Sequence, residues 1–189
     1  MKLETQIERL SSLVSELLDV SRMQAGTLEY TEEVLDLDAL IQEAVETVQR
    51  VHPEHTLNIH GRPTHATILA DRSKLNQVFT NLLNNAIKYS PHADAVDISL
   101  EVAQGAALVR VRDYGIGISQ EHLGHIFERF YRVNTSKHHH VTGLGMGLYI
   151  VQEIVKHHRG TITVTSEEGR GSTFSVLFPL CERAFSPHK

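Results

Sequence analysis

Hydrophobic residues in the first 25 positions recur at spacings of three and four, which is typical of an amphipathic helix that packs against other helices. The seam consists of Leu3, Ile7, Leu10, Val14 and Leu17, and Leu13 and Leu18 widen it. Gly26 favours the end of this helix at that position. The pattern leaves two interpretations open: a helix folded onto its own domain, and a helix that pairs with a segment outside this sequence.

Beyond residue 30 the pattern changes to alternating strands and helices. Apolar and polar residues alternate, as in strands, over 32–37, 56–60, 66–70, 95–103, 107–113, 160–167 and 172–180. Helical spacing predicts helices that end near Val51, span 72–89 and span about 146–158. Asp36 or Asp38 is the expected N-cap of the first of these helices, and Asp71 that of the second.

Turn residues between successive strands favour hairpins. They lie at 61–63, 104–105 and 168–171. Antiparallel strands with three helices predict an α+β fold, a two-layer α/β sandwich that carries an N-terminal helix and has its helices on one face of the sheet. A glycine-rich polar stretch, 113–145, is expected to interrupt the regular structure.

Composition narrows the class of protein. The net charge of −5 gives no global sign of a nucleic-acid partner. The single cysteine, Cys181, excludes an internal disulfide and fits a reducing cytoplasm. No apolar run reaches transmembrane length. We therefore expect a cytoplasmic chain that is anchored to a membrane, if at all, only through other parts of a longer parent protein.

The predicted helix 72–89 carries an unusual stripe of amides. Gln77, Asn81, Asn85 and Lys88 fall at i, i+4, i+8 and i+11, beside the apolar face of the helix. Asparagine is a poor helix former, because its side chain competes for backbone groups. The stripe is either solvated surface or the border of a cavity, and Asn84 is interpreted as surface alone.

Two glycine-rich segments, 112–119 and 142–150, lie between the regular elements. Glycines two residues apart allow the backbone to approach a ligand closely, and the second segment leads into a helix whose first amides favour phosphate. Their spacing fits neither the dinucleotide fingerprint nor the P-loop. Asp113 ends a predicted strand just before its glycines, where it can cap a turn or accept a hydrogen bond from a base amino group.

Four segments in sequence order resemble the N, G1, F and G2 boxes of sensor histidine kinases. They are NQVFTNLLNNAIKYS, DYGIGIS, IFERFYR and TGLGMGLYIV, and GRGSTFSVLFPL resembles the closing hairpin of that family. The match covers roughly 70–180. Residues 5–28 resemble, less specifically, the second helix of the family's dimerisation and histidine-phosphotransfer domain. The resemblance implies a partial dimerisation helix over 1–28 and a catalytic ATP-binding domain of the Bergerat fold over 29–189.

The resemblance also implies a site for ATP and Mg²⁺. Asn85 would hold the metal ion, Lys88 would contact phosphate, and Asp113 would accept the adenine amino group. Phe127 and Phe130 would seat the base of a lid. The other nucleotide-binding residues that the resemblance implies are Tyr89, Gly115, Gly117, Arg132, Gly143, Leu144, Gly145, Gly147 and Ser172.

The type of residue at the position of Asn81 distinguishes the branches of this superfamily. The gyrase and Hsp90 branches place a glutamate at this position to activate water, and an amide cannot act as a base. The resemblance therefore implies Asn81, Asn85 and Lys88 as catalytic residues of phosphoryl transfer to a histidine. Two alternatives stay open: an ATP-sensing regulatory module without phosphotransfer, and an ATPase of the same superfamily.

None of the thirteen histidines is followed by an acidic residue, as the phosphoacceptor of this family usually is. We expect the acceptor on a helix that precedes residue 3. The expected partners are then the phosphotransfer domain, in a homodimer, and the receiver domain of a response regulator. The remaining histidine clusters are predicted to be polar surface: His138–His140, His122 with His125, and His157 with His158.

Overall fold

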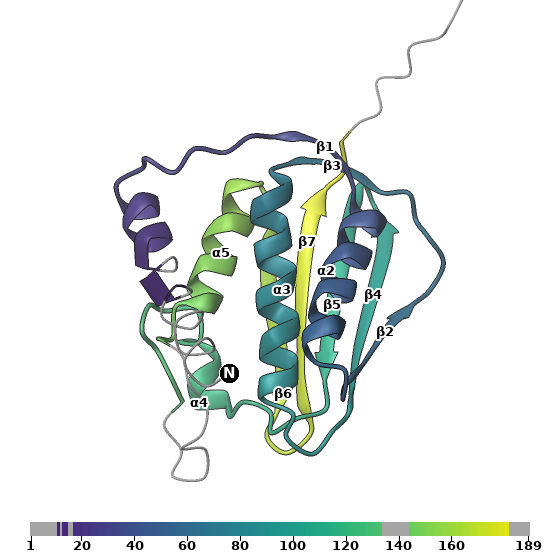
Figure 1. The fold of residues 1–189 in the computed structure, drawn as a ribbon, viewed down its shortest axis with the longest axis vertical. Coiled ribbons are helices and arrows are strands. Elements are labelled where there is room, and N and C mark those ends of the chain that lie inside the picture. Colours follow the sequence, from purple (N-terminus) through teal and green to yellow (C-terminus); the bar gives the residue numbers. More distant parts are fainter. Residues whose placement is uncertain (1–10, 12, 15–16, 134–143, 182–189) are drawn as a thin grey trace, which may run out of the picture.

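A helical layer covers one face of a mixed sheet in the computed structural model, which describes residues 11, 13–14, 17–133 and 144–181 (Figure 1). The elements are β1 (Glu33–Asp36), α2 (Leu37–Val51), β2 (Thr56–His60), β3 (Thr67–Ala70), α3 (Arg72–Lys88), β4 (Ala95–Ala103), β5 (Ala106–Asp113), α4 (Gln120–Leu123), α5 (Gly147–His157), β6 (Thr161–Glu167) and β7 (Gly171–Pro179). The predicted α+β class is confirmed. The short helix α4 lies inside a stretch for which no regular structure was predicted.

The large sheet has the strand order β2-β4-β5-β7-β6. Both predicted hairpins of its interior, β4–β5 and β6–β7, are present, and β5 pairs antiparallel with β7. The expectation of a wholly antiparallel sheet is wrong, because β2 pairs parallel with β4. A parallel pair requires a crossover connection, and α3 lies within the segment that connects these strands.

The turn at 61–63 does not form the hairpin that the sequence suggested. β2 and β3 belong to different sheets, since β3 pairs antiparallel with β1 in a small two-stranded sheet. The chain between them therefore leaves one sheet and enters another. This small sheet holds the segments that lead into α2 and α3.

Both helix starts are capped as predicted. Asp36 accepts a hydrogen bond from the Ala39 amide (3.0 Å), which makes it the N-cap of α2, whereas Asp38 binds the Thr64 amide (3.1 Å). Asp71 caps α3 by accepting from the Lys74 amide (3.0 Å). These caps satisfy amides that the first turn of a helix leaves without partners.

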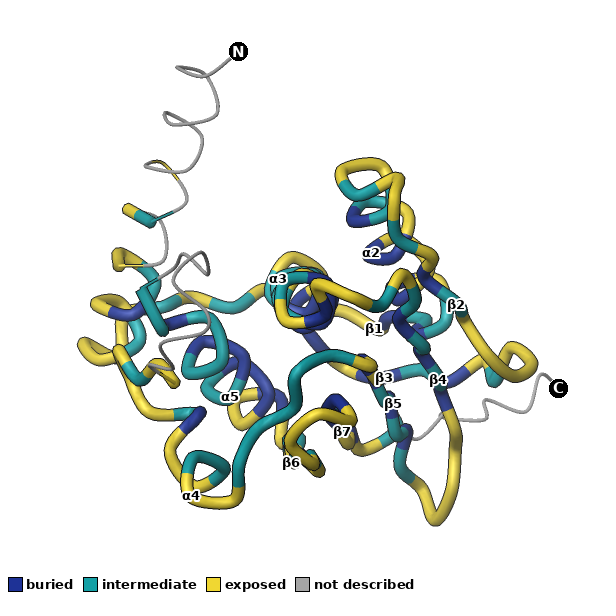
Figure 2. Tube along the Cα trace, turned by 90° about the horizontal axis from the view of Figure 1, so that it is seen from below, coloured by how far each residue is buried: buried dark blue, intermediate teal, exposed yellow. Residues whose placement is uncertain are grey.

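The core lies between the helices and the sheet, as the burial pattern along the chain shows (Figure 2). Of the helices, α3 contributes the most buried residues to this core through its inward face. Alternate residues of the strands pack against that face. The buried residues of α3 are Leu75, Val78, Phe79, Leu82, Leu83, Ala86 and Ile87. These residues form the apolar face that the sequence predicts beside the amide stripe of this helix.

The N-terminal helix ends at Gly26, as predicted. Residues 17–24 are helical, and Gly26 has a φ of +63°. The Thr27 amide donates to the Arg22 carbonyl (3.0 Å) and the Gly26 amide to the Met23 carbonyl (3.2 Å), which is the Schellman pattern. In the part of the chain that the structure describes, no helix is long and apolar enough to cross a membrane.

His158 corrects one prediction, because it is buried rather than part of a polar surface. Its Nε2 accepts a hydrogen bond from the Asp71 amide (3.0 Å), and its Nδ1 lies 2.8 Å from the Ile154 carbonyl. Since Nε2 accepts, Nδ1 carries the proton and donates. Burial lowers the pKa of this imidazole, so the neutral ring joins the end of α5 to the start of α3. His138–His140 lie outside the described residues.

Candidate functional site

Asp113, the last residue of β5, is the buried carboxylate of the candidate site. Its Oδ1 accepts hydrogen bonds from the amides of Gly115 (2.9 Å) and Ser172 (3.2 Å). Burial raises the pKa of this carboxyl, and the two amides partly oppose that effect. A carboxylate offers about four acceptor positions, so Asp113 keeps the capacity to accept from a base amino group.

Glycines around Asp113 let separate backbone segments meet. A Cβ on Gly115 would lie 2.0 Å from the Tyr89 carbonyl oxygen, and a Cβ on Gly117 would lie 2.1 Å from that of Glu167. Gly117 also has a φ of +67°, which disfavours other residues. The first glycine segment is therefore packed between the end of α3 and the end of β6.

Gly171 and Ser166 belong to this arrangement and were missed by the sequence analysis. A Cβ on Gly171 would lie 2.1 Å from the Asp113 carbonyl oxygen. The Ser166 hydroxyl accepts from the Ile118 amide (2.8 Å) and donates to the Gly171 carbonyl (2.9 Å). It also lies 2.9 Å from the hydroxyl of Ser172, which the resemblance did name. The alternation of β6, which turns Ser166 to the same face as Val164, was the available signal.

The C-terminal half of α3 presents the predicted amides. Asn81 and Asn85 are half-buried and Asn84 is exposed, as expected. Within the described residues, neither Asn81 nor Asn85 makes a side-chain hydrogen bond with another part of the chain. Gln77 differs from them, because its amide donates to Asp19 (2.9 Å) and so holds the N-terminal helix. Gln77, at the start of the stripe, therefore has a structural role, whereas the side-chain amides of Asn81 and Asn85 make no such contact.

Cationic side chains gather beside Tyr89, the C-cap of α3. The Lys88 Nζ lies 5.3 Å from the centre of the Tyr89 ring. Desolvation raises the pKa of the Tyr89 hydroxyl, while the positive charge of Arg132 acts in the opposite direction, which places Arg132 in electrostatic reach. Lys88, Tyr89 and Arg132, named separately from the sequence, are thus brought together.

The F box and the second glycine segment are joined by their backbones. The Phe130 amide donates to the Gly145 carbonyl (3.1 Å), and a Cβ on Gly145 would lie 2.6 Å from the Tyr131 carbonyl oxygen. Leu144 and Phe127 pack against the core, whereas Phe130 is exposed. A Cβ on Gly147, the first residue of α5, would meet no described atom within 4 Å, and Gly143 lies outside the described residues.

These residues fit a magnesium nucleotide. Asp113 supplies an acceptor for a base, Asn81 and Asn85 supply neutral amide oxygens of the kind that a hard cation accepts, and Lys88 and Arg132 supply positive charge for phosphates. The glycines clear space for backbone approach. This set of acceptors, amides and cations is chemically suited to a nucleotide and its phosphates.

Comparison with known proteins agrees with this interpretation. The family described as "Histidine kinase-, DNA gyrase B-, and HSP90-like ATPase" matches residues 70–182. Sensor protein SrrB of Staphylococcus aureus is 34% identical over 173 residues, which cover 91% of this chain and 30% of that protein. The chain thus spans about a third of the length of the curated relatives it matches.

Solved structures of histidine kinases share the fold. The mycobacterial sensor histidine kinase MprB is 27% identical, with a TM-score of 0.69 over 79% of this chain and 98% of that one. AdeS of Acinetobacter baumannii is 27% identical, with a TM-score of 0.73 over 95% of this chain and 82% of that one. Full-length ShkA in complex with AMPPNP is 27% identical, with a TM-score of 0.79 over 95% of this chain and 38% of that one.

The matched family covers more than half of the chain. The first glycine segment and the closing hairpin meet at the buried Asp113, and the first glycine segment also packs against the end of α3. The chain belongs to the histidine kinase-, DNA gyrase B- and HSP90-like ATPase family, as an ATP-binding catalytic domain of the sensor histidine kinase type.

Proposed function

We propose that this domain transfers the γ-phosphate of ATP to a histidine of a dimerisation and phosphotransfer domain, from which the receiver domain of a response regulator takes it. The observation that supports transfer is Asn81, half-buried on α3 one turn before Asn85. An amide at this position cannot deprotonate water, so the site favours an acceptor that needs no base. A neutral imidazole nitrogen is such an acceptor.

The chain's own residues would hold and orient the nucleotide. Asp113 accepts the adenine amino group, and Ser172 lies beside it at the start of β7. Asn85 would hold Mg²⁺, with Asn81 next to it, and the ion would neutralise phosphate charge as the leaving oxygen departs. Lys88 and Arg132 contribute further positive charge near Tyr89. In the transfer a P–N bond forms, the bond from the γ-phosphorus to its bridging oxygen breaks, and ADP leaves.

We propose that residues 1–28 belong to the dimerisation domain and residues 29–189 to the catalytic domain. Val14, Leu17 and Leu18 are about half exposed, at 49%, 46% and 52%. Apolar side chains on a helix that are left this exposed are suited to packing against further helices. By the same proposal the domain works in the cytoplasm, and any membrane anchor lies in other parts of a longer parent protein.

The test supplies the acceptor separately. The full chain is incubated with labelled ATP, Mg²⁺ and a phosphotransfer domain from a related kinase, and acid-labile phosphohistidine is measured. The wild-type chain should label the acceptor, and Asn85→Ala should lose at least about tenfold in rate, since one charge-positioning ligand is removed. Asn84→Ala is the matched control, because Asn84 lies on the same helix and is exposed.

The alternatives give different results in the same experiment. Nucleotide binding without labelling of any acceptor would indicate an ATP-sensing module. Steady ADP production without an acceptor would indicate an ATPase. Equal rates for Asn85→Ala and Asn84→Ala would contradict the assignment of the metal to Asn85.

A further inference from the structure

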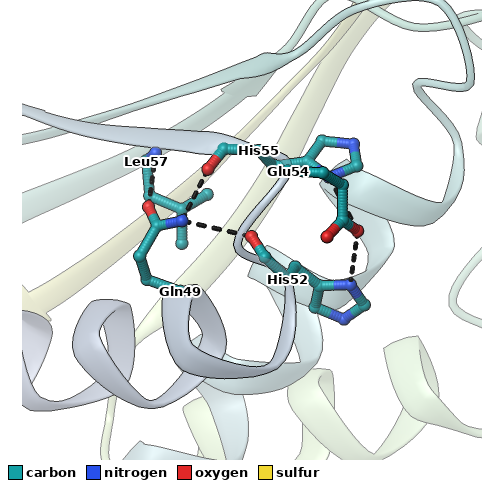
Figure 3. A network of polar contacts seen from close by, with 5 residues as sticks. All are labelled: Gln49, His52, Glu54, His55 and Leu57. Atoms are coloured by element: carbon teal, nitrogen blue, oxygen red, sulfur yellow. Dashed lines mark hydrogen bonds and ion pairs between the residues drawn. The ribbon is translucent and has the colours of Figure 1, made fainter.

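The turn between α2 and β2 gathers three side chains that can bind a metal ion (Figure 3). His52 is the C-cap of α2, and Glu54 and His55 follow it after Pro53. One ligand atom from each of His52, Glu54 and His55 lies within 4.8 Å of the other two. No role was assigned to these residues in nucleotide binding.

The separations within this cluster suit one small ion. Nδ1 of His52 lies 3.4 Å from Oε1 of Glu54, and Nδ1 of His55 lies 3.3 Å from the same oxygen. Bonds of about 2.0–2.2 Å place neighbouring ligands of a tetrahedral zinc ion about 3.3–3.6 Å apart. Two of the three edges already have this length. The third edge joins the two imidazole nitrogens, which lie within 4.8 Å of each other, and a small rotation of the half-buried His52 side chain can shorten it.

His55 provides an independent sign of a ligand. Its Nδ1 is buried and makes no hydrogen bond with any described residue. The nearby Glu54 oxygen is close enough for an ion pair but does not meet hydrogen-bond geometry. A buried polar atom without a partner is costly, and most such atoms in folded proteins are satisfied. A metal ion between His55 and Glu54 would satisfy it.

The turn is fixed in place before any ion binds. The Gln49 amide group donates to the carbonyls of His52 (3.1 Å) and His55 (2.5 Å). The Gln49 Oε1 accepts from the Leu57 amide (3.1 Å), and Pro53 restricts the backbone further. Figure 3 shows Gln49 on one side of the turn and the imidazoles on the other. Preorganisation of this kind reduces the ordering cost of binding.

We propose that His52, Glu54 and His55 bind one divalent transition-metal ion of the zinc class through Nδ1, a carboxylate oxygen and Nδ1, with water as the remaining ligand. Imidazole favours zinc, copper and nickel over magnesium, which prefers oxygen ligands. The site therefore differs in chemistry from the one at Asn85. It also lies in a different part of the fold, the turn between α2 and β2.

The experiment must resolve individual histidines, because the chain has thirteen. The full chain is treated with diethylpyrocarbonate with and without Zn²⁺, and modified residues are mapped by mass spectrometry. Zn²⁺ should protect His52 and His55 together. His60 is the internal control: it is exposed and pairs with one carboxylate, Asp97 (2.8 Å), but no second histidine joins it among the described residues.

Variants complete the test. His55→Gln and Glu54→Gln should each weaken the protection of His52 by at least about tenfold in Zn²⁺ concentration, because one of three protein ligands is lost. His60→Gln should leave it unchanged. Glu54 is exposed, so Glu54→Gln leaves the fold intact even where His55→Gln does not. Unchanged labelling of His52 and His55 at saturating Zn²⁺, or equal protection in Glu54→Gln and wild type, would overturn the proposal.

Discussion

Asp113 lies where three segments of backbone meet, and burial disfavours its charge. A buried carboxylate with a raised pKa lowers the stability of the fold at neutral pH, because the unfolded chain ionises more readily. Such a group is typical of sites where a ligand uses the charge. Its two amide donors position the carboxylate, and its remaining acceptor capacity is what a bound base would use.

Asp113→Asn should therefore weaken nucleotide binding without weakening the fold. We expect about tenfold or more loss of ATP affinity, measured by calorimetry, since a hydrogen bond to a charged group is lost. The free energy of unfolding should stay equal or rise, because a buried charge is removed. Glu101→Gln, which removes an exposed charge from β4, is the control. A variant with wild-type ATP affinity would contradict the adenine role.

The raised pKa of Asp113 also predicts that the affinity for ATP depends on pH. Because the folded pKa of Asp113 is raised above 3.8, wild-type affinity for ATP should fall as the pH drops through that raised value, where the carboxylate gains a proton. The affinity of Asp113→Asn should change less over the same interval, because the variant has no proton to gain there.

Much of this site could be predicted from sequence motifs, but the contacts that bring its separate segments together could not. Asp113 and Gly115 stand in one short segment, so their proximity follows from the sequence. The contact of Gly171 with the Asp113 backbone depends on β7 lying beside β5, and strand order is not visible in alternation. Ser166 was missed for the same reason, since its partners come from the loop after β5 and the start of β7.

At the scale of elements, Gly171, the first residue of β7, tests the contact between β7 and the end of β5. Gly171→Ala should lower the free energy of unfolding by about 2 kcal/mol or more, since it adds a collision to the cost of a positive φ. Gly105→Ala is the matched control, with a similar positive φ and no atom within 4 Å of the added Cβ. It should cost about 1 kcal/mol. Chemical denaturation measures both, and equal losses would show that the contact is not tight.

His158 links α5 to the N-cap of α3, and its effect depends on pH. Its folded pKa is lowered below 6.5, so the unfolded chain takes up a proton first as the pH falls. Stability should therefore decrease from about pH 7 to about pH 5.5, with at most about 1.4 kcal/mol per pH unit from this residue.

His158→Gln keeps an acceptor for the Asp71 amide and removes the titration. Denaturant curves at both pH values should show a smaller loss for the variant than for wild type. His92→Gln, in which an exposed histidine without an ion pair among the described residues is replaced, should retain the wild-type loss. A variant with an undiminished pH dependence would exclude His158 as its source.

Strand positions were predicted well, whereas two strand pairings were not. Alternation identifies which residues face the core, and the hairpins β4–β5 and β6–β7 follow from short turns. The partners of β2 and β3 are separated from them by helices, so no local signal selects them. The parallel pair β2–β4 and the small sheet β1–β3 depend on how α2 and α3 pack on the whole domain.

At the scale of the whole molecule, the N-terminal helix has two faces. One face packs on the domain: Val20 is buried, Met23 contacts the core and Asp19 binds Gln77 and Lys74. The other face leaves Val14, Leu17 and Leu18 exposed. Packing on the chain's own domain, the first interpretation, therefore holds for the described residues of this helix, and pairing with a further segment stays a prediction.

We expect self-association to involve the exposed face. Leu17→Glu with Leu18→Glu should shift the chain toward monomer in sedimentation velocity, because burying charge in an apolar contact is costly. Gln24→Glu adds a charge to an exposed position of the same helix and serves as the control. Identical distributions for wild type and the double variant would place any dimer contact elsewhere.

The parallel pairing of β2 with β4 has a consequence for the order of folding. The register brings Asn58 opposite Asp97, 39 residues later, whereas the hairpins of the sheet close across a few residues. A long loop loses entropy before its contacts repay the loss, so short-range pairs form first. Among the described residues, β2 is also an edge strand of the large sheet that pairs with β4 alone. β2 is thus expected to join the sheet after the β4–β5 hairpin has closed and, as an edge strand, to be released early by local fluctuations.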